Sequence, residues 1–137
     1  MKMTRASSYA LHAVAYMAAR KKGKEDVDAI ASHHIAAERK IPERFLLKVL
    51  KPLVSAQILM SIKGPNGGYR LARAANDITM LEIVEAVDGP IRGYAPFNPQ
   101  APDSTMDKRL DQVCSGISEQ MRKALGKVKM SELAGKD

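Results

Sequence analysis

Apolar residues recur at three- and four-residue intervals through the first twenty positions of the chain. The recurring residues are Ala6, Tyr9, Ala10, Ala13, Val14 and Met17. This spacing places them on one face, so it predicts an amphipathic helix over about residues 4–20. The cations and the glycine at residues 20–23 favour a helix C-terminus there.

Two more helices are predicted close together in the sequence. A short one covers about residues 32–38, and another starts near Pro42, because proline suits a first helical turn. Pro52 should loosen the last turn of this other helix. Its apolar positions predict a buried face that comprises Phe45, Leu46, Val49, Leu50 and Leu53. The pair, joined by a short turn at residues 39–41, has the arrangement of a helix-turn-helix.

The hydrophobic period then changes from helical to alternating. Strand-like runs at residues 58–62 and 69–71 flank the glycine-rich stretch KGPNGG, which predicts a β-hairpin. Thr79 and Glu82 have the spacing of a capping box, which predicts a further helix that begins at Thr79. The buried face of that helix would comprise Met80, Ile83, Val84 and Val87.

The last third of the chain combines a linker with a long helix. Residues 89–105 hold four of the seven prolines, which indicates a segment without regular structure. A helix is predicted over about residues 106–130, because apolar residues there alternate four- and three-residue spacings, as in a helix that packs along another helix. The residues of this seam are Leu110, Cys114, Ile117, Met121, Ala124 and Val128.

These elements predict a mainly α (α+β) fold: a winged helix-turn-helix with a two-stranded wing and a long C-terminal helix. The expected division is a helix-turn-helix domain over residues 1–88, a linker over residues 89–105, and a dimerisation helix with its tail over residues 106–137. No internal repeat interrupts this order.

The net charge of +7 is unevenly distributed along the chain. Residues 1–76 hold 14 Lys and Arg against 5 Asp and Glu, whereas residues 77–137 hold 8 against 10. One basic half indicates nucleic acid, an anionic membrane or an acidic protein as partner, although it could also be a solvated surface. The longest apolar run is too short for a transmembrane helix, and we expect no membrane partner.

The glycine-rich stretch has two interpretations, a phosphate-binding loop or a hairpin tip. A phosphate-binding loop needs Lys and Ser or Thr after its second glycine, but Gly67 is followed by Gly68, Tyr69 and Arg70. A hairpin directly after a helix-turn-helix is instead the order of a winged-helix DNA-binding domain, and the slim turn would then enter or skirt a groove of the duplex.

The residues that we expect to contact DNA fall into three groups. Those of the recognition helix are Pro42, Glu43, Arg44 and Lys48, of which Glu43 and Arg44 could also be solvated surface. Those suited to phosphates are Lys2, Arg5, Arg39, Lys40 and Lys51. Those of the wing are Lys63, Gly64, Pro65, Asn66, Gly67, Gly68, Tyr69 and Arg70.

Catalytic and metal sites find little support in the sequence. His33 and His34 are adjacent, so on a helix they point about 100° apart and cannot easily share one metal. His12 is expected to be structural. Ser7 and Ser8 have no nucleophile elbow, and no carboxylate pair is set near a histidine by a recognisable spacing, so we expect no enzyme. We also expect no metal and no cofactor. The single cysteine excludes an intramolecular disulfide and favours a cytoplasmic protein.

Five stretches resemble the Rrf2 family of bacterial winged-helix regulators, of the IscR, NsrR and CymR type. They are YALHAVAYMA, IPERFLLKVLKPL, IKGPNGGYRLAR, ITMLEIVEAVDGP and KVKMSEL. The resemblance implies a homodimeric transcription regulator whose recognition helix enters the major groove and whose wing reaches the minor groove. It also implies a long C-terminal helix that crosses its partner.

Several positions depart from the family pattern. Lys40 and Gln57 stand where the family often has glycine. Cluster-binding relatives hold three cysteines in the loop before the long helix, but residues 89–105 have none. An iron–sulfur cluster needs several thiolates, so no cluster is expected. Cys114 is then either a small apolar core residue or a thiol-based redox sensor.

The leading hypothesis is a cluster-free, homodimeric DNA-binding repressor on a palindromic operator in double-stranded DNA. The rival hypothesis is a protein-interaction module on the same fold that acts through a partner enzyme. A partner protein or a small effector is compatible with either hypothesis, and the sequence identifies neither.

Overall fold

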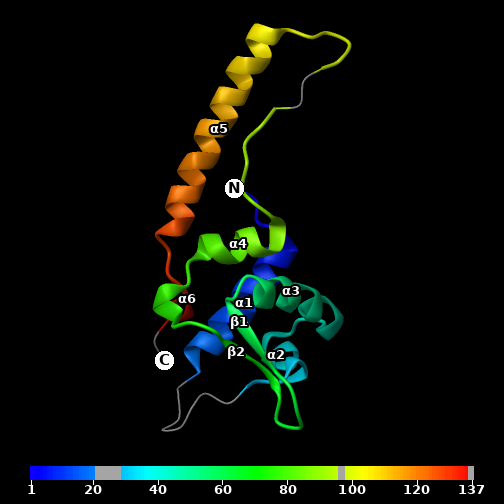
Figure 1. Ribbon diagram of the computed structural model, residues 1–137, viewed down its shortest axis with the longest axis vertical. Coiled ribbons are helices and arrows are strands. Elements are labelled where there is room, and N and C mark those ends of the chain that lie inside the picture. The colour runs from blue at the N-terminus through cyan, green and yellow to red at the C-terminus, as the bar shows by residue number, and fades with distance from the viewer. Residues whose placement is uncertain (21–28, 96–97, 136–137) are drawn as a thin grey trace.

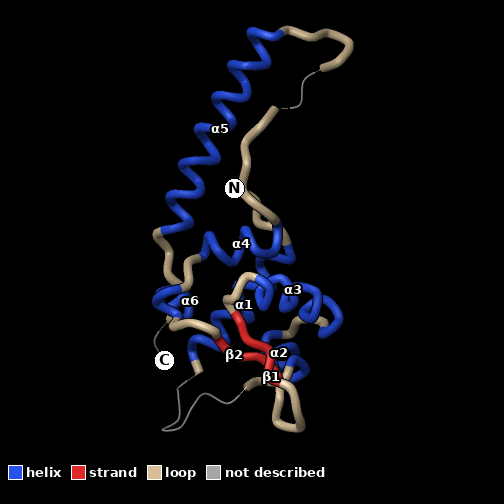
Figure 2. The backbone as a smooth tube through the Cα atoms, in the orientation of Figure 1, coloured by secondary structure: helices blue, strands red, loops and turns tan. Residues whose placement is uncertain are grey.

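The computed structural model describes residues 1–20, 29–95 and 98–135, and within them the chain is mostly helical (Figures 1 and 2). The elements are α1 (Arg5–Ala19), α2 (Ser32–Arg39), α3 (Glu43–Ser55), β1 (Leu59–Ile62), β2 (Gly68–Leu71), the 3-10 helix η1 (Ala75–Asp77), α4 (Met80–Asp88), α5 (Ser104–Gly126) and α6 (Met130–Ala134). All but α5 form one body, from which α5 projects as a long arm (Figure 1).

Helix α1 lies at the centre of the body and packs against α2, α3, α4, α6 and β2. Its apolar stripe is buried as predicted at Ala10, Ala13, Val14 and Met17. Small side chains on this stripe let several neighbours approach closely, because interiors are packed to near-crystal density. The largest fully buried side chains around it come from α2, α3, the hairpin, α4 and α6, and they include Ile35, Leu46, Leu50, Leu53, Ile58, Leu59, Ile78, Ile83 and Met130.

A carboxylate at the end of α4 joins that helix to the start of α1. Asp88 accepts hydrogen bonds from the hydroxyls of Thr4 at 2.8 Å and of Ser7 at 2.6 Å. Thr4 is also the N-cap of α1, where its hydroxyl accepts from the Ser7 amide. A negative charge next to a helix N-terminus is favourable, and the contact satisfies the fully buried Ser7 hydroxyl.

The predicted hairpin is present and is extended by a third segment. Strands β1 and β2 are antiparallel, with Leu59 opposite Leu71 and Ile62 opposite Gly68. Ile30, just before α2, exchanges two backbone hydrogen bonds of 2.8 Å with Tyr69. The hairpin is therefore tied to the entry of α2 as well as to the end of α3.

The capping box predicted at Thr79 is confirmed, since Thr79 caps the Glu82 amide and Glu82 accepts from the Thr79 amide. The single helix predicted over residues 106–130 is wrong at its end. Helix α5 stops at Gly126, and Val128 lies in an extended segment whose carbonyl accepts from the Met80 amide at 2.8 Å. This pairing with the start of α4 breaks the long helix and leads into α6, which packs on α1.

Helix α3 corrects one predicted core residue. Leu46, Val49, Leu50 and Leu53 are buried as expected, but Phe45 is 40% exposed. One helical step of about 100° separates Phe45 from Leu46, which is enough to turn it out of the core. The helix also runs three residues past Pro52, whose own carbonyl accepts from the Ala56 amide at 2.9 Å.

The two positions where the family often has glycine are also the only non-glycine residues with positive φ among the described residues. Lys40 has φ 54° in the turn between α2 and α3, and Gln57 has φ 61° between α3 and β1. A side chain in this region costs roughly 1–2 kcal/mol, which explains why glycine suits both sites. Burial of apolar residues in the elements on either side of each turn outweighs this backbone strain.

Replacing Gln57 with glycine should therefore stabilise the protein. We expect Gln57→Gly to raise the free energy of unfolding by up to about 1 kcal/mol, after allowing for the greater freedom of glycine in the unfolded chain. The matched control is Gln112→Gly on the exposed surface of α5, which should lower stability by about 1 kcal/mol. Urea unfolding followed by circular dichroism measures the free energy of unfolding of both variants. A lower value for Gln57→Gly than for the parent protein would contradict the proposed backbone strain at Gln57.

Candidate DNA-binding surface

The outward face of α3 carries two cations packed on an aromatic ring. The guanidinium carbon of Arg44 lies 5.0 Å and the ammonium of Lys48 5.6 Å from the centre of the Phe45 ring. Such contacts at an exposed site are worth roughly 0.5–1 kcal/mol and hold the cations over the ring. Leu47, which is 43% exposed, and Lys51 lie further along the helix. The face thus offers both charge and apolar surface.

The turn that positions this face is held by backbone and side-chain bonds. The Ile41 amide donates to the carbonyl of Ala36 at 2.9 Å and closes α2, while Pro42 caps α3. The hydroxyl of Ser32, at the start of α2, donates to the Glu43 carboxylate at 3.0 Å. Glu43 therefore joins the two helices, and this bond competes with its predicted contact with DNA.

The structure turns Arg39 away from the outward face of α3 and towards α1. Its Nη2 atom donates to Nδ1 of His12 at 2.6 Å. Because arginine can only donate, the Nδ1 atom of His12 is an acceptor and the ring carries its proton on Nε2. His12 thus links α1 to the end of α2.

The tip of the hairpin is open, but two of its glycines have an internal reason to be there. Lys63, Gly64, Pro65 and Asn66 are exposed. A side chain at Gly67 would collide with the backbone of residues 62–64. At Gly68 it would collide with the backbone of Ile30. Their slimness therefore follows from packing within the protein, and it does not by itself indicate approach to a groove.

The two remaining wing residues lie on opposite faces of the hairpin. Arg70 is half-buried and pairs across the strands with Met60, whose sulfur lies 3.9 Å from Nη2 of Arg70. Tyr69 faces a shallow groove of about 350 Å³ between α3 and the wing. Leu47 and Lys51 of α3 form the other wall of this groove. The sequence analysis did not predict Leu47 as a residue of this surface. An apolar residue among the cations of the polar face of α3 could have indicated it.

The N-terminal cations lie apart from this surface. The N-terminus is next to α4, and the wing tip is at the other end of the body (Figure 1). Lys2 and Arg5 flank Thr4, which is bonded to Asp88 of α4. The remaining predicted residues lie in the turn before α3, on α3 and on the hairpin. Tyr69 faces α3 across the groove that it shares with Leu47 and Lys51, whereas Arg70 lies on the opposite face of the hairpin.

Neither a cluster of metal ligands nor a membrane-spanning helix is found among the described residues. Within residues 1–20, 29–95 and 98–135, no three His, Cys, Asp or Glu side chains converge as metal ligands. His33 and His34 are both exposed on α2. Across the same ranges, no helix combines the length and the apolar content that a membrane crossing requires.

Comparison with known proteins identifies the family. The Rrf2 family model, described as an iron-dependent transcriptional regulator, matches residues 3–136. The chain belongs to the Rrf2 family. It is a winged-helix transcriptional regulator and not an enzyme, because the family model and the named relatives are all described as regulators and the fold is that of a winged helix.

Relatives resemble the chain over most of its length. A protein of Mycobacterium tuberculosis, provisionally named as an HTH-type transcriptional regulator, is 26% identical over 136 residues, which is 98% of this chain and 82% of the relative. Protein aau3 of Rhizobium meliloti is 30% identical over 125 residues, 91% of this chain and 75% of the relative. The structure of CymR, the global cysteine regulator of Bacillus subtilis, has the same fold, with a TM-score of 0.73 and 22% identity over 98% of this chain and 96% of that one.

The residues of this chain do not fit the iron group that the description of the Rrf2 family implies. Cys114 is the only cysteine, and it is half-buried in α5, where the linker backbone at Gly93 lies against its carbonyl. An iron–sulfur cluster needs several thiolates or substitutes around one point. The Asp111 carboxylate, one turn away, is engaged by the Ala95 amide at 3.0 Å.

We therefore expect protein purified without oxygen to carry no stoichiometric iron or sulfide. Cys114→Ser should bind DNA within a few-fold of the parent protein, because Cys114 is the only cysteine and no cluster of metal ligands surrounds it among the described residues. Iron and sulfide assays on anaerobic protein test the first expectation. A near-stoichiometric cluster would contradict it. An oxidant response that is present in the parent and lost in Cys114→Ser would instead identify Cys114 as a redox sensor.

Proposed function

We propose that this Rrf2-family regulator is a homodimeric repressor that binds a palindromic operator in the cytoplasm. The observation that carries the proposal is the exposed face of α3, where Arg44 and Lys48 pack on the Phe45 ring. The hairpin lies next to the later part of the same helix, where Leu47 and Lys51 share a groove with Tyr69. Occupying an operator with two such subunits would exclude the transcription machinery from the same DNA.

The chemistry of this face suits base edges as well as phosphates. Arginine pairs with the two acceptors of guanine in the major groove, and exposed apolar side chains contact the thymine methyl group. We assign the first role to Arg44 and the second to Phe45 and Leu47. Lys63 and Arg70 would reach phosphates or the minor groove from the hairpin, supported by the excess of cations in residues 1–76.

The exposed stripe along α5 supports a second copy as partner. Met106, Leu110, Val113 and Ile117 are all exposed, with Val113 at 59% and Ile117 at 53%. Their spacing of four and three residues is that of a helix seam, and such a stripe is costly to leave in water. The exposed stripe differs from the predicted seam. It includes Met106 and Val113, which were not predicted, whereas the predicted Cys114 and Met121 are half-buried. The proposed division keeps residues 1–88, 89–105 and 106–137 as DNA-binding, linking and dimerising parts, although α6 packs on α1.

The wing cations should contribute to affinity through phosphates. Lys63→Ala and Arg70→Ala should each weaken duplex binding and make the log–log salt dependence shallower by roughly one unit. Arg44→Ala should instead relax base preference at one operator position, at a cost of about 1–3 kcal/mol. Fluorescence anisotropy across a salt series, on operator selected from genomic fragments, measures all three.

Lys108→Ala is the matched control, because Lys108 is an exposed cation on α5 outside the proposed surface. It should keep the parental affinity and slope within about 0.3 units. Parental behaviour of both wing variants would show that the hairpin is not a DNA contact. Failure to enrich any sequence from genomic fragments would favour the protein-interaction module.

The dimer should depend on the stripe of α5. Ile117→Asp would place carboxylates in the seam, which costs several kcal/mol and should give monomers. Gln112→Asp adds the same charge at an exposed position off the stripe and should leave the dimer intact. Sedimentation at low micromolar concentration compares the two, and an intact dimer in Ile117→Asp would place the interface elsewhere.

A further inference from the structure

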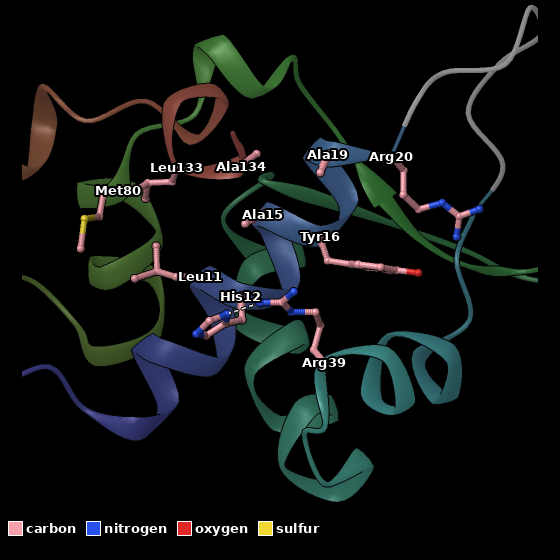
Figure 3. Close-up of a pocket in the computed structure, with 10 residues that line it drawn as sticks. All are labelled: Leu11, His12, Ala15, Tyr16, Ala19, Arg20, Arg39, Met80, Leu133 and Ala134. Atoms are coloured by element: carbon pink, nitrogen blue, oxygen red, sulfur yellow. Dashed lines mark hydrogen bonds between the residues drawn. The ribbon is translucent and has the colours of Figure 1, made fainter. Parts of the chain in front are cut away.

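An open groove of about 710 Å³ runs along α1, with residues of α4 and α6 on one side and Arg39 from the end of α2 on the other (Figure 3). Leu11, Ala15 and Ala19 recur every four residues and form its floor. This stripe extends over about 12 Å of helix. The other apolar residues that line it are Met80 of α4 and Leu133 and Ala134 of α6.

Cations gather towards one side of the groove. Arg39 reaches in from the end of α2 with its guanidinium on His12, and Arg20 extends past Tyr16 with its guanidinium 6.0 Å from the ring centre (Figure 3). Among the described residues that line the groove there is no Asp or Glu. Neither arginine makes an ion pair within the described part of the chain. Within the described residues, the groove therefore combines an apolar floor with two arginines that pair with no acidic side chain.

We propose that this groove binds a small-molecule carboxylic acid with an unbranched apolar body, and that it is the effector site of the regulator. Pockets of this size with an apolar lining and few polar groups are typical of small-ligand sites. His12 occupies one of the five N–H donors of Arg39, so others remain for a carboxylate, which arginine binds through paired, charge-assisted bonds. The alanines at Ala15, Ala19 and Ala134 leave the space that the apolar body would fill.

The effector role rests on the proposed DNA-binding function, and the path to it is short. Arg39 is the last residue of α2, Lys40 makes the left-handed turn, and buried Ile41 leads into α3. A carboxylate on the remaining N–H donors of Arg39 acts on the Arg39–His12 link between α1 and this turn. Binding then shifts DNA affinity to the extent that the ligand binds the free and the DNA-bound regulator with different affinities.

Octanoate is the probe, and octanamide is its uncharged counterpart. Isothermal titration calorimetry on the full chain without DNA should give saturable binding of octanoate, at least tenfold tighter than octanamide. Arg39→Gln should weaken octanoate at least tenfold, and Ala15→Phe, which fills the groove, should abolish it. Arg109→Gln removes the same charge from α5, outside the groove, and should change the affinity less than twofold.

Several results would overturn the site. One is equal affinity for the two probes, and another is no saturable binding of octanoate up to solubility. A third is protection of Ala15→Cys from a maleimide in a Cys114→Ser background, which would mean that a second copy covers the groove. Because these measurements contain no DNA, they stand even if the operator experiments fail. Octanoate binding that leaves operator affinity unchanged would keep the ligand site but overturn its role as effector site.

Discussion

The packing of α1 is the constraint on which the rest of the structure depends. Every other element of the body except β1 and η1 is packed against this helix. Close approach on several sides is possible because Ala10 and Ala13 are fully buried and small. A larger residue at either position would push the surrounding helices apart, at a cost typical of overpacking, about 1–3 kcal/mol or more. The start of α1 is fixed separately, by the hydroxyls that meet Asp88.

The same arrangement orients the DNA-binding surface. The backbone bonds between Ile30 and Tyr69 attach the hairpin to the start of α2, and the Ser32–Glu43 bond attaches the start of α2 to α3. The start of α2, at Ile30 and Ser32, therefore holds both α3 and the hairpin. If α3 and the hairpin both contact DNA, as we propose, this attachment lowers the entropy lost on binding, because a helix and a hairpin that moved independently would first have to be ordered.

The sequence predicted those features that depend on local pattern. The helix-turn-helix, the hairpin and the Thr79 capping box follow from spacing within a few residues. Features set by distant packing were not predictable. Phe45 matches the apolar stripe of α3 as well as Leu46 does, and only the position of α1 decides which is buried. Likewise the seam that seemed to continue through Val128 ends at Gly126, because the next segment pairs with the start of α4.

Helix α5, which would contact the proposed partner subunit, makes few contacts with the rest of its own chain. Arg122 pairs with Glu85 of α4 at 3.3 Å at the lower end of the helix, and Ala95 of the linker bonds to Asp111 in its upper half. Most of the remaining surface of α5 is exposed. In a symmetric dimer built on the stripe, the crossing of the two α5 helices sets the distance between the two α3 helices. In such a dimer the contact between Glu85 and Arg122 would help to orient each body relative to this crossing, and would influence half-site spacing without touching DNA.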